Sequence, residues 1–178
     1  MKLGALVLFG ATAMAIVTAA TASAQGVNDA QIAAIVVTAN QVDIDAGKLA
    51  ESMGKASEVK KFGAEMAKDH TGVNKSAVEL VTKLKVTPED NPTAASLKKG
   101  GMENVEALKK LNGAAFDKAY IDHEVAYHEQ VLEAMDKTLI PGAKNDELKA
   151  LLVKVRPAFV SHLAHAKMLQ SKMMKTMD

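Results

Sequence analysis

Three of the five histidines in the chain lie at positions whose helical neighbours are apolar. His70 lies between Met66 and Val73, and His128 and His162 have similar surroundings in two later segments. A buried imidazole needs a partner, because a polar atom left without one in a core costs about 1–3 kcal/mol. Neutral imidazole is also a common ligand of first-row divalent metals. The spacing therefore predicts either one metal site shared by three helices or three separate core histidines with their own partners.

Asp43 is the candidate carboxylate for such a site. It shares a helical row with Asn40 and Gly47 at the edge of an apolar stripe, and its small neighbours leave room for a polar group. A carboxylate at this edge is expected to reach an ion only through water. The metal hypothesis therefore assigns a first-row divalent ion to four ligands, Asp43, His70, His128 and His162.

The level of these side chains along the helices can be compared by counting from the turns. Asp43 and His70 are offset by about 4.5 Å when each is counted from the turn between them, at about 1.5 Å per residue. His128 and His162 are offset by about 7.5 Å when counted in the same way. His123 would match His162 better in level, so it remains an alternative ligand.

The spacing argues against other kinds of site. A di-iron site of the E-x-x-H type needs a Glu three residues before a His, and the chain has none. Glu124 lies four residues before His128 and is expected to orient that ring. Gly-rich phosphate loops and the G-x-S-x-G and H-E-x-x-H motifs are absent, so the sequence names no reaction and leaves enzymatic activity open. His165 lies near the edge of its stripe and is a further alternative ligand.

The composition limits the partners and the chemistry. The chain has 178 residues, 48% of them hydrophobic, with 22 Lys and Arg against 21 Asp and Glu. This balance is typical of a folded globular protein and gives no basic surface for nucleic acid. The absence of Cys excludes disulfides, thiolate metal ligands and a Cys nucleophile.

Residues 1–24 have the features of a signal peptide. Lys2 supplies a positive start, an uncharged run follows, and Ala22-Ser23-Ala24 provides the A-x-A site of a signal peptidase. Cleavage before Gln25 would release the protein into a bacterial periplasm, without a membrane anchor. The alternative is an uncleaved anchor, because the segment is long enough to span a bilayer.

The spacing of apolar residues is helical throughout and predicts an all-α fold. Residues 25–178 are expected to form one domain with its core at about 28–173. Ser57 is expected to cap the second helix, and Pro157 to kink the last one. The predicted arrangement is an antiparallel four-helix bundle with a short extra helix in the crossover. Helices are expected at about 28–53, 57–84, 94–99, 102–111, 114–139 and 146–173.

Several short motifs resemble the exported, ferritin-like domain-of-unknown-function 4142 family. They are Asp43-Ile-Asp-Ala-Gly-Lys-Leu-Ala50, Val59-Lys-Lys-Phe62 leading to Met66-Ala-Lys-Asp-His70, Phe116-Asp-Lys-Ala-Tyr120, and Pro157 to His162. The resemblance covers about residues 28–170. It implies an exported, ferritin-like helical bundle, and by position it singles out Asp43, His70, His128 and His162. It implies no settled activity.

Two functional hypotheses follow from these patterns. The first is an exported protein that binds a metal ion through the histidines and the carboxylate, in metal handling or envelope stress protection. The second is a non-enzymatic structural or interaction protein of the cell envelope, in which the histidines only specify the packing of the helices.

Overall fold

The computed structural model describes residues 26–175, and this part of the chain is all-α, as predicted, with no strand. The expected signal peptide lies outside the described residues. No helix within them is both long and apolar enough to cross a membrane. The elements in chain order are α1 (Asp29–Met53), α2 (Ser57–Lys83), α3 (Pro92–Leu108), α4 (Gly113–Ala134), the π-helix η1 (Met135–Leu139), α5 (Ile140–Gly142) and α6 (Asp146–Lys175).

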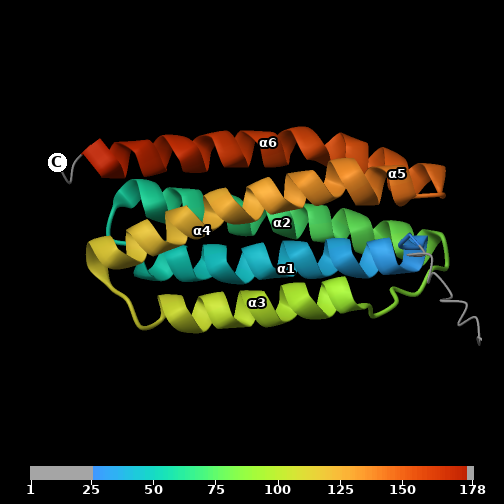
Figure 1. Ribbon diagram of the computed structural model, residues 1–178, viewed down its shortest axis with the longest axis horizontal. Helices are drawn as coiled ribbons and strands as arrows, with labels where there is room; N and C mark the ends of the chain where they lie inside the picture. The colour runs from blue at the N-terminus through green and yellow to red at the C-terminus, as the bar shows by residue number, and fades with distance from the viewer. Residues whose placement is uncertain (1–25, 176–178) are drawn as a thin grey trace, which may run out of the picture.

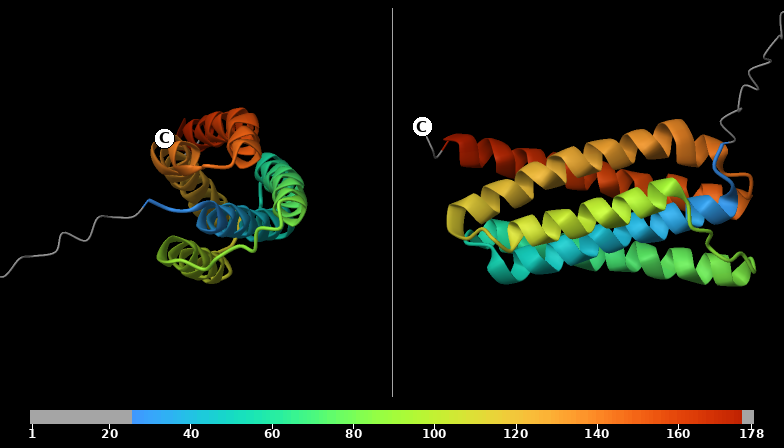
Figure 2. Two further views of the ribbon diagram at one scale, coloured as in Figure 1. Left: turned by 90° about the vertical axis from the view of Figure 1, so that its right-hand side faces the viewer. Right: turned by 60° about the horizontal axis from the view of Figure 1, so that its bottom comes forward.

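The long helices lie side by side along the long axis of the molecule, and successive helices run in opposite directions (Figure 1). Because α3 carries the chain back along this axis, α2 and α4 run in the same direction. The end-on view in Figure 2 shows α3 beside α1, on the side of the molecule away from α6. Helices α1, α2, α4 and α6 therefore surround a common interior, and α3 covers part of its outside.

Asparagine side chains cap three of the helices. Asn28 accepts a hydrogen bond from the Gln31 amide, and the Gln31 side chain accepts one from the Asn28 amide, which forms a capping box. Asn91 caps α3 through the Ala94 amide, and Pro92 follows at the first helical position. Asn145 accepts from two amides at the start of α6. Side-chain oxygens thus satisfy amides that would otherwise lack a partner.

The prediction that Ser57 caps α2 is wrong. The N-cap position is Ala56, which makes no side-chain cap bond, and Ser57 is the first helical residue. The turn is held instead by the buried Asp117 of α4, whose carboxylate accepts hydrogen bonds from the amides of Lys55 at 2.7 Å and Ala56 at 2.8 Å. A residue 61 positions away in the sequence replaces the local cap.

The two short helices expected at 94–99 and 102–111 are one continuous helix, α3. Gly100 and Gly101 do not end it. Gly101 is buried where α3 crosses α1, and a Cβ there would lie 2.6 Å from Val42 Cγ2. The glycine therefore permits a close contact between the two helices. The low helix propensity of Gly predicts a break at this position, but packing against α1 outweighs it.

The helix expected at 114–139 is also different from the prediction. Helix α4 ends at Ala134 and passes directly into the π-helix η1 and the short α5, so that the helical chain reaches Gly142. Helix α6 continues through Pro157 to Lys175. The kink expected at Pro157 stays a prediction.

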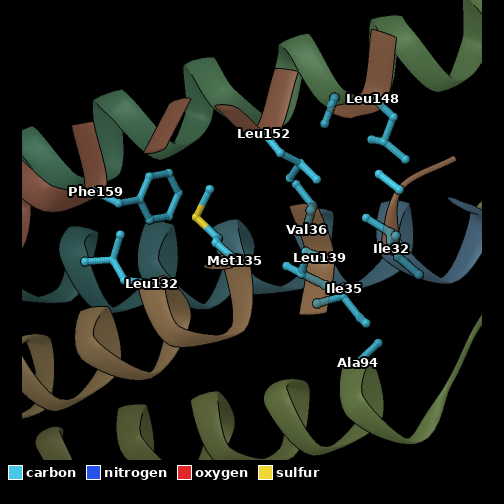
Figure 3. Close-up of a cluster of buried hydrophobic side chains, with 13 residues drawn as sticks. Ile32, Ile35, Val36, Ala94, Leu132, Met135, Leu139, Leu148, Leu152 and Phe159 are labelled. Carbon is cyan, nitrogen blue, oxygen red and sulfur yellow. The ribbon is translucent and has the colours of Figure 1, made fainter. Parts of the chain in front are cut away.

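Two clusters of buried apolar side chains hold the helices together. The first lies toward the η1 and α5 end and includes Ile35, Leu132 and Phe159. Figure 3 shows its side chains pointing toward one another from different helices. The second lies toward the other end and includes Phe62 and Phe116. The segment between these clusters is where the polar residues of the interior are found.

Candidate metal centre

The four predicted ligands come from four different helices and meet between the two apolar clusters. Asp43 lies on α1, His70 on α2, His128 on α4 and His162 on α6. On each helix the residue falls between the part of the chain in one cluster and the part in the other. Their shared level is therefore set by the same packing that forms the core.

The predicted offset between His128 and His162 is too large, because it placed the end of the α4 segment at Leu139. His128 lies 14 residues before Gly142, where α5 ends, and His162 lies 16 after Asp146, where α6 begins. The difference of two residues corresponds to about 3 Å along the axis. The continuation through η1 and α5 thus brings the two rings together.

The three rings form a nearly equilateral triangle. Their centroids are 5.6 Å apart for His70 and His128, 5.2 Å for His70 and His162, and 5.5 Å for His128 and His162. One potential ligand atom from each ring lies within 4.8 Å of the others. All three side chains are buried.

Asp43 lies inside this cluster and not at its edge. Its side chain is only 1% exposed, and its Oδ2 lies 3.2 Å from His70 Nε2 and 3.7 Å from His128 Nε2. The expectation that Asp43 would act only through water is therefore not supported by its position. The carboxylate is close enough to share an ion directly with both rings.

Asn40 fixes the proton position on His70. Its Nδ2 donates to the Val36 carbonyl at 2.8 Å, so its Oδ1 is the atom that faces His70 Nδ1 at 2.7 Å. Because this oxygen can only accept, Nδ1 carries the proton and donates. The Nε2 lone pair of His70 is consequently directed at the Asp43 carboxylate.

The other two rings are held in the same way. His128 Nδ1 donates to the Glu124 carbonyl oxygen at 3.0 Å, and His162 Nε2 donates to Asp69 Oδ2 at 3.1 Å. The opposite nitrogens, His128 Nε2 and His162 Nδ1, are buried and have no hydrogen-bond partner within residues 26–175, and the same holds for His70 Nε2. An outer N–H held by an oxygen and an inner lone pair left free is the usual arrangement of a metal-binding histidine.

Glu124 is a second carboxylate in the interior. It is fully buried, and its Oε2 lies 3.5 Å from His128 Nδ1. Glu124 was expected to orient the His128 ring. It does so through its backbone carbonyl oxygen, which accepts a hydrogen bond from the ring N–H. Among the described residues, neither Glu124 nor Asp43 is paired with a Lys or Arg. Two buried acids thus share one region without a permanent cation.

Burial controls the protonation of the cluster. Loss of water lowers the pKa of His70 to about 2 and that of His128 to about 4, so both rings are neutral at pH 7. Burial raises the pKa of Asp43 to about 7. Burial also raises the pKa of Glu124 well above its usual range, and the charge of Asp43 adds to that rise. The metal-free site therefore disfavours charge of either sign.

The family model described as "Domain of unknown function (DUF4142)" matches residues 13–169. The chain belongs to this family. A search of curated proteins and a search of solved structures gave no match. Membership in the DUF4142 family confirms the resemblance seen in the motifs. The family is described as one of unknown function, so membership assigns no activity.

The remaining histidines of this DUF4142 protein lie outside the cluster. His123 stacks on Tyr127, with ring centroids 5.6 Å apart. His165 Nδ1 lies 3.1 Å from Glu65 Oε2 at the half-exposed contact between α2 and α6. Neither ring was expected as a principal ligand, and neither is brought to Asp43.

Two residues that hold the site were not identified from the sequence. The sequence indicates Asn40 only as a neighbour of Asp43 on the same helical row. It indicates Asp69 only as one residue of the motif from Met66 to His70. Asp69 belongs to α2 but holds a histidine of α6. A contact between helices this distant in sequence leaves no periodic signal.

Proposed function

We propose that this protein binds one first-row divalent metal ion through His70, His128, His162 and Asp43. The ion would lie in the interior of a ferritin-like four-helix bundle formed by α1, α2, α4 and α6. This arrangement is supported by the origin of the ligands, because each of these helices supplies one of them and α3 supplies none.

One observation carries the proposal. Three buried ring nitrogens without a hydrogen-bond partner face a region that also holds the buried carboxyl groups of Asp43 and Glu124, which interact with each other. The ring lone pairs repel the Asp43 carboxyl group when it is ionised, and each polar atom left without a partner costs about 1–3 kcal/mol. A cation between these atoms would satisfy all of them at once, and the charges of Asp43 and Glu124 would balance a divalent ion.

The donor set favours zinc as the reference ion. Neutral imidazoles and a carboxylate are ligands of Zn²⁺, which is usually four-coordinate in closed protein sites. Two donors at about 2.1 Å from a tetrahedral ion are about 3.4 Å apart. The separations of 3.2 and 3.7 Å between Asp43 Oδ2 and the rings of His70 and His128 are close to this value.

Metal handling in the periplasm is the role we infer for this site. The A-x-A motif at residues 22–24 supports export, and intact mass of the mature chain tests it. Asp69 links the interior to the surface, because its side chain is 40% exposed and its carboxylate holds His162. Ions that enter between α2 and α6 would meet this acid first.

Calorimetry and thermal melting of the untagged, chelator-stripped protein test the proposal. Zinc should bind at one ion per chain and raise the melting temperature, because a ligand that binds only the folded state stabilises it by about 2.7 kcal/mol at a hundred times its Kd. His128→Gln should abolish both effects. His123→Gln, on the same helix but outside the cluster, should leave both unchanged.

The proposal would be refuted if zinc, copper, manganese and iron all left the melting of stripped protein unchanged. The histidines would then be structural. In that case His128→Leu should leave stability unchanged or raise it slightly, since replacing a polar group by an apolar one of similar shape removes an unsatisfied atom.

A further inference from the structure

A cavity of about 220 Å³ lies next to the histidine cluster, inside the first apolar cluster. Its walls come from five of the helices and the π-helix. Ile35 lies on α1, Val73 on α2, Leu97 on α3, Val131 on α4 and Leu152 on α6. More elements contribute to its lining than would line a groove between two helices, and the cavity opens to the surface.

The lining of the cavity contains no Asp, Glu, Lys, Arg or His side chain. Two of its polar groups are already hydrogen-bonded within the protein. The Tyr127 hydroxyl donates to the Ala39 carbonyl at 2.8 Å, and both ends of the Asn40 amide are occupied by Val36 and His70. The interior therefore offers contact to apolar atoms and no free partner for a charged group.

The polar side chains Thr93 of α3 and Gln130 of α4 are exposed, so they mark the mouth of the cavity between these helices. The π-helix η1 contributes Met135 and Leu139 to the wall. Figure 3 shows both side chains directed toward α1 and α6. Single-turn π-helices within α-helical segments are frequent at functional sites, and this one shapes the wall of the cavity.

We propose that this cavity binds one small, neutral, apolar molecule, of the size of one or two aromatic rings. An engineered apolar cavity of about 150 Å³ stays dry and binds benzene or xenon. The cavity of this protein is larger and its lining is mostly apolar, so an apolar occupant would gain dispersion contacts with its walls. The occupant would lie beside the metal centre, because Phe159 and Asn40 line the cavity and both contact His70.

Titration of metal-free protein with toluene tests this proposal separately from metal binding. Methyl NMR signals of Ile35, Val131 and Leu152 should shift and saturate at one toluene per chain. Signals of Val59, in the second apolar cluster, should not move. Benzoate, which has the same ring and a negative charge, should produce no saturable shift, since burial of an unpaired charge is unfavourable.

Substitutions that fill the cavity supply the control. Ala134→Leu adds a side chain to the lining and should weaken toluene binding by at least about tenfold. Ala150→Leu makes the same change at an exposed position of α6 and should leave the affinity unchanged. If Ala134→Leu does not fold, Val155→Phe fills the same space. Equal shifts in both apolar clusters, or unchanged affinity in the filled variants, would overturn the proposal.

Discussion

Replacing Asp43 by Asn should stabilise the metal-free protein at pH 8. Burial raises the pKa of this carboxyl from 3.8 to about 7, so the folded state holds the proton more tightly than the unfolded state. A raised pKa stabilises the fold at low pH, and this contribution is lost as the pH rises to about 7. At pH 8 the carboxyl is ionised in both states, and the full cost of its buried charge is present.

The magnitude follows from the size of the pKa change. The rise from 3.8 to about 7 is about three pH units, and each is worth about 1.4 kcal/mol. The buried charge therefore costs on the order of 4 kcal/mol. Burying the Asn amide has a cost of its own, about 1–3 kcal/mol when its hydrogen bonds are incomplete. A net gain of about 1–3 kcal/mol is expected at pH 8, with no net gain expected at pH 5, where the cost of the Asn amide offsets the smaller penalty.

Urea melts in the presence of a chelator measure this gain, and Asp45→Asn is the matched control. Asp45 is an exposed carboxylate two residues further along α1, where such a change is usually within about 0.5 kcal/mol. Asp43→Asn should also lose most of the zinc-induced rise in melting temperature. Destabilisation of the metal-free protein by more than about 1 kcal/mol at pH 8 would refute the reasoning, because Asp43 would then support the fold without a metal.

The pH dependence of zinc binding, one buried aromatic side chain and two glycines give further tests. Zinc affinity of the folded protein, measured by calorimetry, should fall by at least about tenfold per pH unit below pH 7, because Asp43 must release its proton to bind. Phe159→Ala should destabilise by about 3–5 kcal/mol in urea melts, and a change below about 0.5 kcal/mol would contradict its burial. Gly63→Ala should destabilise by about 1–3 kcal/mol, since its Cβ would lie 2.6 Å from the Gly47 oxygen. Gly72→Ala, with open space around it, should stabilise by about 0.5–1 kcal/mol in the same melts.

The sequence predicted the helical class well because apolar stripes recur with helical spacing. The bounds expected for the first helix, about 28–53, agree with those of α1. The errors lie where a distant contact decides the local structure. Gly101 is retained inside α3 because α1 packs against it. The π-helix η1 could not be predicted, since its apolar residues follow the same pattern as an α-helix.

The candidate ligands could be named from the sequence because each histidine interrupts an otherwise apolar row. The partners that orient them could not. Asn40 and Asp69 look like ordinary polar residues of a helix, and their role depends on which ring another helix places beside them. Glu124 was expected to face His128, but its complete burial depends on the packing of all the surrounding helices. Whether the four named ligands bind a metal stays a prediction.

A pair of glycines explains how a short carboxylate reaches the centre. Gly47 lies one turn after Asp43 on α1, and Gly63 lies two turns before His70 on α2. A Cβ on Gly47 would lie 2.6 Å from the Gly63 oxygen, so only glycine allows the two backbones to approach this closely. This approach brings Asp43 Oδ2 to 3.2 Å from His70 Nε2. The glycines and the aspartate therefore act as one set, because a larger side chain at either glycine would separate the helices and move the carboxylate away from the imidazole.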